Sequence, residues 1–374
     1  MKPRQSVWSA LLTLLVWAFA ACLVSVLLCA YPARAASASA AATTATAVST
    51  PAVAGLAPEA LYELSMAPTC DYEARIKTWN PSTAEVWVDA VRADGITVYS
   101  IRASGCVASV ALANGMRVFY RTSPNAASSG SVVDATYPLV VAQRMRALAS
   151  LAEPLHYDSA LLSENYTLAT ARGAAVAGRE TIELRIEPKW PGNVRRTVWT
   201  DLHTGTALRV EDRNYRGDLI WLWEVERISF ESSHRHVVQA ARAALSSAEA
   251  LPCIGPRMSL GEVSRTAGFV VALPAWAPEG YRLVALRPAR AIGDPGESGP
   301  GRLRLMARMA PVAQLIYSDG LGTITFYQRA VPWWARRASA PRVGHAIEWE
   351  RNGIRYLLVG DVDPELLLKM ARSL

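Results

Sequence analysis

The chain has 374 residues, of which 51% are apolar and 19% charged, with 12 Trp and 13 Tyr. This composition excludes a chain that is disordered throughout, because disordered chains contain few aromatic and aliphatic residues. It also excludes a multi-span membrane protein. Only residues 7–31 form an apolar run near the roughly 20 residues that a bilayer-spanning helix needs.

The positive charge is concentrated toward the end of the chain. The formal net charge is +7, and residues 251–374 alone hold 16 Lys and Arg against 10 Asp and Glu. An excess of this size without a run of Lys favours an acidic partner or a membrane surface over nucleic acid. We therefore expect no nucleic-acid partner.

The amino terminus has the features of an export signal. Two basic residues precede the apolar run at 7–31, and the Ala-Arg-Ala sequence that ends at residue 35 matches a signal-peptidase site. The run is longer than an ordinary signal core of about 7–15 residues. Residues 1–35 are therefore either a cleaved signal peptide or a membrane anchor. Both alternatives predict export, with a periplasmic location that is free or anchored to the inner membrane. Residues 36–56 are rich in Ala, Ser and Thr and predict a flexible tether.

From residue 57 the pattern is typical of an antiparallel β protein. Short β-branched and aromatic segments alternate with turn pairs such as Asp94-Gly95, which favours a hairpin because both positions tolerate positive φ. The predicted strands of two successive meanders and of a last group are Tyr72–Trp79, Ala84–Val91, Thr97–Arg102, Val107–Leu112, Arg117–Arg121, Tyr166–Ala171, Glu180–Glu187, Arg195–Asp201, Ala207–Asp212, Leu219–Ser229, Arg282–Leu286, Leu303–Met309, Ala313–Ser318, Thr323–Arg329, Ala346–Arg351 and Ile354–Gly360.

Few helices accompany these strands. The predicted ones are Glu59–Met66, Leu139–Leu151, Leu260–Gly268 and a terminal helix that begins after the Asp363 cap. We therefore expect an α+β fold in which one large curved antiparallel sheet with covering helices occupies residues 57–231. A linker at 232–256 then leads to a second, smaller α+β domain at 257–374.

Aromatic residues within the strands are candidates for a lipid-binding cavity. They are Tyr72, Trp79, Trp87, Tyr99, Tyr120, Trp199, Trp221 and Trp223. A strongly curved sheet with few covering helices encloses an apolar space that side chains do not always fill. The alternative is that these rings fill a closed core.

A second group of candidates points to partner binding. Adjacent tryptophans and adjacent arginines follow one another in a loop, and exposed Trp and Arg are enriched at interaction hot spots. The alternative is a Pro-induced bend that packs both rings onto the small sheet. The partner-binding candidates are Tyr317, Phe326, Trp333, Trp334, Arg336 and Arg337.

The cysteines permit one disulfide. Cys70 and Cys106 flank predicted strands of one domain, and they are the predicted pair in an oxidising compartment. The alternative is that these two and Cys253 are all unpaired. The sequence contains no C-x-x-C, H-E-x-x-H, G-x-S-x-G or phosphate-binding loop. We expect neither an enzyme nor a metal or cofactor site.

Several turn and strand signatures resemble the RseB/MucB family of periplasmic sigma-factor regulators. They occur in both predicted domains, at Val176-Ala177-Gly178-Arg179-Glu180, Val198-Trp199-Thr200-Asp201, Thr204-Gly205, Pro278-Glu279-Gly280-Tyr281 and Tyr317-Ser318-Asp319-Gly320-Leu321. The resemblance covers most of residues 58–374.

The resemblance implies a particular fold and function. The first domain would be a half-barrel like the lipoprotein carriers LolA and LolB, with a lipid-accommodating cavity. The smaller domain would bind the extracytoplasmic part of a membrane-bound anti-sigma factor and shield it from proteolysis, and a lipid or envelope-stress ligand would relieve the shielding. The alternative function is a LolA-like carrier or chaperone of lipid or lipoprotein acyl chains, which needs only the first domain.

Overall fold

The computed structural model describes residues 53–67, 70–80, 84–103, 106–113, 116–122, 159–231, 235–246, 251–252, 258–290, 311–331 and 346–374. Several predicted features lie outside these ranges, namely the apolar run at 7–31, most of the tether at 36–56, the helix Leu139–Leu151, the strand Leu303–Met309, Cys253, Trp333, Trp334, Arg336 and Arg337. Among the helices within them, none has the length and apolar character needed to cross a bilayer.

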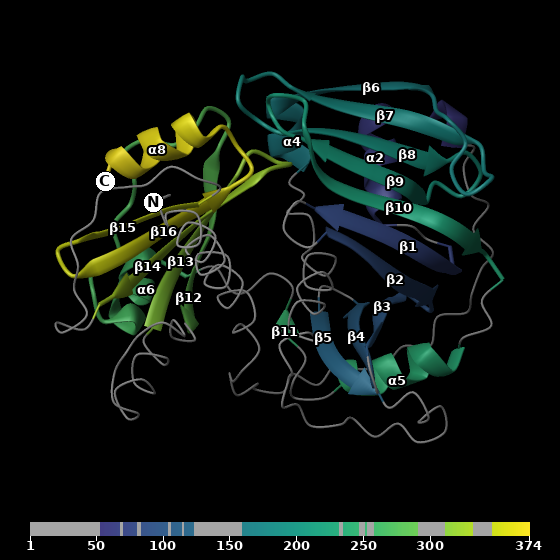
Figure 1. The fold of residues 1–374 in the computed structure, drawn as a ribbon, viewed down its shortest axis with the longest axis horizontal. Helices are drawn as coiled ribbons and strands as arrows, with labels where there is room; N and C mark the ends of the chain where they lie inside the picture. Colours follow the sequence, from purple (N-terminus) through teal and green to yellow (C-terminus); the bar gives the residue numbers. More distant parts are fainter. Residues whose placement is uncertain are drawn as a thin grey trace, which may run out of the picture.

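The larger domain is built on one antiparallel sheet of eleven strands in the order β11-β5-β4-β3-β2-β1-β10-β9-β8-β7-β6 (Figure 1). Its strands are β1 (Tyr72–Asn80), β2 (Ala84–Ala93), β3 (Ile96–Ala103), β4 (Cys106–Ala113), β5 (Met116–Thr122), β6 (Tyr166–Arg172), β7 (Thr181–Pro188), β8 (Arg195–Asp201), β9 (Ala207–Arg213), β10 (Leu219–Ser229) and β11 (Leu251–Pro252). The two predicted meanders are joined by the pairing of β1 with β10, which runs from Glu73 opposite Ser229 to Trp79 opposite Leu222.

The sheet has two chemically different faces, which the register defines because directly paired residues share a face. The inner face carries the main apolar core, including Ile76, Val88 and Val198, and packs against α2 (Pro58–Met66) through Leu61 and Tyr62. The outer face carries the residues that alternate with these inner-face residues along each strand.

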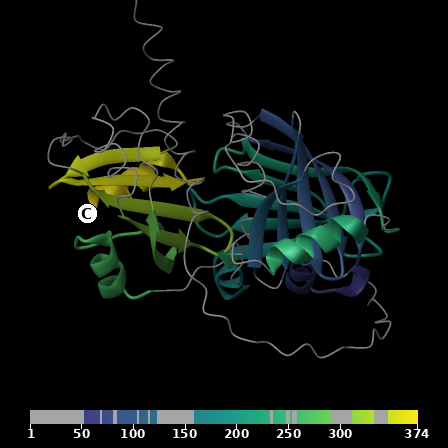
Figure 2. The same cartoon turned by 90° about the horizontal axis from the view of Figure 1, so that it is seen from below.

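The segment predicted as a linker at 232–256 belongs in part to the larger domain. Its helix α5 (Arg235–Leu245) lies across the outer face of β2 to β4 (Figure 2). Val238, Ala241 and Ala244 are buried there against Val91 and Val98. β11 then pairs with β5 at the edge of the sheet. The prediction that this whole segment is a linker was wrong. Alanines at helical spacing give a weak apolar signal in the sequence, although they allow a helix to pack closely on a sheet.

The smaller domain is a five-stranded antiparallel sheet in the order β12-β13-β14-β16-β15, with α6 (Leu260–Ala267) and α8 (Pro364–Arg372) as its helices. The strands are β12 (Arg282–Arg290), β13 (Pro311–Ser318), β14 (Thr323–Ala330), β15 (Ala346–Arg351) and β16 (Ile354–Gly360). Asp363 caps α8 by accepting a hydrogen bond from the Glu365 amide at 3.0 Å, as predicted. The α+β fold with a large curved antiparallel sheet and a smaller domain is confirmed (Figure 1).

Candidate functional site

The register divides the eight aromatic candidates between the two faces of the large sheet. Four belong to the inner face with the apolar core, namely Tyr72, Tyr99, Trp221 and Trp223. Trp79, Trp87 and Trp199 occupy outer-face positions. Tyr120, of which the structure describes only the backbone, pairs with Ser109 of the outer face. The eight residues therefore do not line one common surface, and lipid contact by the inner four stays a prediction.

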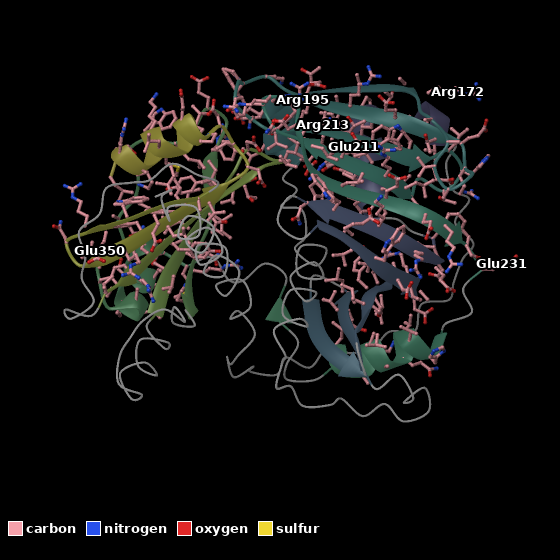
Figure 3. The ribbon with its side chains drawn as sticks, in the orientation of Figure 1. Arg172, Arg195, Glu211, Arg213, Glu231 and Glu350 are labelled. Atoms are coloured by element: carbon pink, nitrogen blue, oxygen red, sulfur yellow. The ribbon has the colours of Figure 1, made fainter. Side chains whose placement is uncertain are left out.

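Two outer-face tryptophans lie beneath arginine side chains that also form ion pairs with carboxylates of the same face. The Arg209 guanidinium is 4.9 Å from the centre of the Trp199 ring, and that of Arg75 is 5.4 Å from the Trp87 ring. Glu211 pairs with both Arg209 and Arg213, and Figure 3 shows Glu211 close to Arg213 on the large sheet. Cation–π contacts and charge pairs thus account for tryptophans on a solvated face.

One arginine on the inner face is fully neutralised inside the protein. Arg196 is 2% exposed, and its guanidinium makes a two-pronged ion pair with Asp212, each N···O distance being 2.6 Å. Its third bond is donated to the Tyr62 hydroxyl of α2 at 2.9 Å. Burial alone would lower the pKa of Arg196, but Asp212 and Tyr62 more than offset it and hold the pKa above its ordinary value. This cluster fixes α2 on the sheet.

A second inner-face arginine is not neutralised in this way. Arg92 lies in register between Tyr72 and Thr97, and one of its terminal nitrogens donates to the Thr97 hydroxyl at 2.9 Å. Its Nε atom is buried without a hydrogen-bond acceptor. Among the described residues no carboxylate pairs with it. The inner face therefore holds a half-buried positive charge where β1, β2 and β3 lie side by side.

The two domains meet at a buried polar junction centred on Asp319. This carboxylate lies in the β13–β14 loop of the smaller domain and is 0% exposed. It accepts hydrogen bonds from the Tyr166 hydroxyl at 2.6 Å and the Asn193 amide at 2.9 Å, both of the larger domain. Amides of Leu321 and Gly322 bind its other oxygen. Burial raises the pKa of Asp319 above its ordinary value, although these donors act in the opposite direction.

Asn165 supplies the other half of the junction. This residue ends α4 (Ser159–Asn165), and its side-chain amide donates to the backbone oxygens of Gly280 at 3.2 Å and Asp319 at 3.0 Å. Its side-chain oxygen accepts from the Trp190 indole at 3.0 Å. Asn165 begins a possible glycosylation sequence, but a side chain that is 2% exposed and bonded in this way belongs to the packing between domains.

Glycine lets the two domains approach this closely. Gly320 has a φ of +102°, and a Cβ there would lie 2.4 Å from the backbone nitrogen of Leu162 in α4. Because that atom is helix backbone, it cannot move aside as a flexible side chain would. The Gly320 backbone is thus in direct contact with α4.

Two partner-binding candidates lie in the core of the smaller domain. Phe326 is 0% exposed and stacks with Trp349 and Tyr356, and Tyr317 is also buried. The prediction that they contact a partner was wrong for the protein as folded, because alternation in β13 and β14 directs both rings inward. Trp333, Trp334, Arg336 and Arg337 lie outside the described residues and stay candidates.

The prediction of a Cys70–Cys106 disulfide was wrong. Cys70 is a free thiol whose sulfur lies 3.1 Å from the Thr206 hydroxyl. Cys106 begins β4, three strands away from β1 in the sheet, and strands lie about 4.8 Å apart. A disulfide needs Cα atoms within about 7 Å. Within the described ranges, no group of His, Cys, Asp and Glu could hold a metal ion.

The sequence analysis did not identify the polar residues of the inner face or those of the Asp319 junction. Arg196, Asp212 and Arg92 stand at inward positions of strands whose neighbouring inward positions are apolar, such as Val198 and Ala90. A charged residue that interrupts an apolar alternation was the available signal. The junction had a further signal, since Gly280 and Asp319 belong to the segments that carry the family resemblance.

Comparison with known proteins finds similarity among solved structures alone. No family model matches the chain, and no curated protein matches it. Among solved structures, a crystal structure of MucB shares 18% identity, covers 84% of this chain and 95% of its own, and has a TM-score of 0.47. The chain is similar to MucB.

Two further structures extend this similarity. The Pseudomonas aeruginosa MucA/MucB complex shares 15% identity, covers 84% of this chain and 96% of the matched one, and has a TM-score of 0.46. A LolA superfamily protein from Nitrosomonas europaea shares 8% identity, covers 49% of this chain and 97% of its own, and has a TM-score of 0.21. MucB and the LolA superfamily are the families that the sequence resembles.

Proposed function

We propose that this protein is a non-enzymatic periplasmic regulator that binds the extracytoplasmic part of a membrane-bound anti-sigma factor and shields it from proteolysis. A lipid or another envelope-stress ligand would be sensed on the inner face of the large sheet. The proposal rests on the family resemblance of the sequence, whose segments lie in both domains, and it agrees with the MucA-bound form of the similar protein.

The observation that carries the proposal is the buried junction at Asp319. A carrier of acyl chains needs only the larger domain, so a second domain held by buried hydrogen bonds has no role in that function. A regulator that senses a ligand in one domain and binds a partner with the other needs the two to be connected. Tyr166 and Asn193 of the larger domain make this connection to Asp319 directly.

The charge of the smaller domain supports an acidic partner. Residues 251–374 carry six more basic than acidic residues. Electrostatic complementarity speeds association and is screened by salt, with a Debye length of about 10 Å at 0.1 M. The partner-binding role of Trp333, Trp334, Arg336 and Arg337 remains part of the proposal.

The test is capture of the partner followed by reconstitution. The full chain, purified from solubilised envelopes, should co-purify with a single-span membrane protein, and the exported part of that protein should bind the chain directly. We expect Kd to weaken about tenfold between 50 and 300 mM salt. Bound chain should slow cleavage of the partner by an envelope protease. Recovery of lipoproteins alone, or unchanged cleavage, would contradict the proposal.

The carrier function remains the second candidate, because the larger domain has a broad apolar inner face with Tyr99, Trp221 and Trp223. It predicts that the full chain moves a fluorescent acyl lipid or a lipoprotein from donor to acceptor vesicles. Transfer without any effect on partner cleavage would favour the carrier over the regulator.

A further inference from the structure

The part of the inner face formed by β1 to β3 holds a guanidinium that the described residues satisfy only in part. Arginine has five N–H donors and stays charged in proteins. For Arg92 the structure gives one donated bond, to Thr97 at 2.9 Å, and a buried Nε without an acceptor. A buried donor without a partner costs about 1–3 kcal/mol, and more for a charged group. An anionic ligand would supply the missing acceptors.

Arg196 shows what a neutralised arginine on this same face looks like. There Asp212 supplies two oxygens at 2.6 Å each and Tyr62 a third acceptor at 2.9 Å. Arg92 has a neighbouring hydroxyl, that of Thr97, in the place of the carboxylate. The geometry that Asp212 provides for Arg196, a planar pair of oxygens, is what a carboxylate or phosphate group offers to a guanidinium.

Two tyrosines border Arg92 and add a hydrogen-bond donor. Tyr72 is the register partner of Arg92, Tyr99 is the partner of the adjacent Ala90, and each hydroxyl carries one hydrogen that can be donated. Burial raises the pKa of both hydroxyls above the ordinary value, while the Arg92 charge acts to lower both. Both phenols therefore remain neutral at physiological pH, and one can donate to an anion beside Arg92.

Apolar residues adjoin this cluster on the same face. Ala90 and Val110 flank Tyr99 in the register, and Leu112 is the partner of Thr97. Ala90 and Val110 are fully buried, whereas Leu112 and Tyr99 are only partly buried at the edge of the inner-face core. A ligand held at Arg92 therefore has the apolar parts of Leu112 and Tyr99 beside its charged end, as an amphiphile with one anionic group requires.

We propose that Arg92, together with Tyr72 and Tyr99, forms a subsite for the carboxylate or phosphate group of a ligand on the inner face, with an anionic single-chain amphiphile as its source. This inference deepens the ligand-sensing part of the proposed function and rests on it. It does not concern the anti-sigma partner.

The experiment compares two amphiphiles with the same unsaturated chain, one with an anionic carboxylate head group and one with a neutral hydroxyl head group. Binding of oleate and of oleyl alcohol to the full chain is measured at equilibrium below micelle-forming concentrations, with inorganic phosphate at constant ionic strength as a third probe. We expect oleate to bind roughly tenfold or more tightly than the alcohol, as charge-assisted bonds suggest. Arg92→Gln should abolish this preference by weakening oleate alone.

Arg75→Gln is the matched control. Arg75 lies on the adjacent strand β1, but on the outer face, where it pairs with Asp89 and Glu226. The Arg75→Gln substitution removes the same charge from the protein and should leave the preference for oleate over the alcohol unchanged. Circular dichroism and the melting temperature establish that both variants are folded.

The results distinguish an amphiphile from a free anion as the source of the group that binds Arg92. Binding of inorganic phosphate that Arg92→Gln abolishes, without an oleate preference, would support an anion subsite and overturn the amphiphile as its source. Three other results would overturn the subsite. They are equal affinity for oleate and the alcohol without phosphate binding, an oleate preference that survives Arg92→Gln, and no binding of any probe. The anti-sigma proposal is tested separately by partner capture, so its failure is distinguishable.

Discussion

The inner face treats a buried positive charge differently on the two sides of the β1–β10 pairing. On the side of β8 and β9, here called the closed end, Arg196 is 2% exposed and is closed off by Asp212 and by Tyr62 of α2. On the side of β2 and β3, Arg92 is only half-buried and has the Thr97 hydroxyl as its acceptor. The same residue type therefore supports the fold at one end and leaves binding capacity at the other.

The closed end is also the end that contacts the smaller domain. Tyr166 begins β6 at the edge of the sheet, and α4 directly precedes it. Both reach the Asp319 loop. Stability and domain connection are thus concentrated at one end, and the ligand is expected at the other. Four substitutions test this division.

The largest effect is expected for Arg196→Met at the closed end. Loss of one partner of a buried ion pair leaves the other charge uncompensated, which typically costs 3–5 kcal/mol. We expect a loss of about 4 kcal/mol in the free energy of unfolding, measured with urea. The double variant Arg196→Met/Asp212→Leu should recover most of it. A double variant as unstable as the single one would show that the pair's charge is not the cause.

Gly320→Ala should have the next largest effect, at the junction. The new Cβ would lie 2.4 Å from the Leu162 backbone nitrogen at a φ of +102°. We expect a loss of roughly 2–3 kcal/mol, from backbone strain and steric clash together. Gly217→Ala is the matched control, because Gly217 has a φ of +87° with nothing within 4 Å of the added carbon. It should lose only about 1 kcal/mol. Equal losses would exclude the clash.

Asp319→Asn should change how stability depends on pH. Burial raises the pKa of Asp319 above its ordinary value of 3.8 in the folded protein. A raised pKa means that folding favours the protonated carboxyl. Its contribution is therefore complete below 3.8 and is lost as pH rises through the folded pKa. Relative to the asparagine variant, the wild type should lose stability over this window. Melting temperatures of both proteins from pH 3.5 upward measure it, and parallel curves would contradict it.

The smallest effect on stability is expected for Arg92→Gln. This guanidinium has no carboxylate partner among the described residues and a buried Nε without an acceptor, so its removal should change the free energy of unfolding by less than about 1 kcal/mol. Urea unfolding without ligand checks this. A loss close to that of Arg196→Met would mean that Arg92 supports the fold, and the contrast between the two ends would fail.

Much of the fold could be predicted from local patterns. Alternation and turn pairs such as Asp94-Gly95, whose φ values are +52° and +75°, identified the strands of both domains. The cap at Asp363 predicted the start of α8. α5 was missed because Ala241 and Ala244 resemble linker residues in composition, and their burial depends on the sheet that they contact.

The candidate sites were less predictable because they depend on long-range partners. Asn165 and the Asp319 backbone oxygen are 154 residues apart in sequence, and their hydrogen bond exists only once the domains have docked. The aromatic candidates failed to form one surface for a simpler reason. Trp79 and Trp87 were selected by residue type, whereas the strand register assigns them to the opposite face from Tyr72.

The pairing of β1 with β10 has a consequence for how the chain folds. Glu73 lies opposite Ser229, so this central seam joins segments that are far apart in sequence. Such high contact order slows folding, because the long loop must close before the contacts stabilise it. Each meander can form from neighbouring hairpins, but the seam must wait until β10 is available to pair with β1. During that interval β1 presents an unpaired strand edge, which is a site at which other chains can add and aggregate.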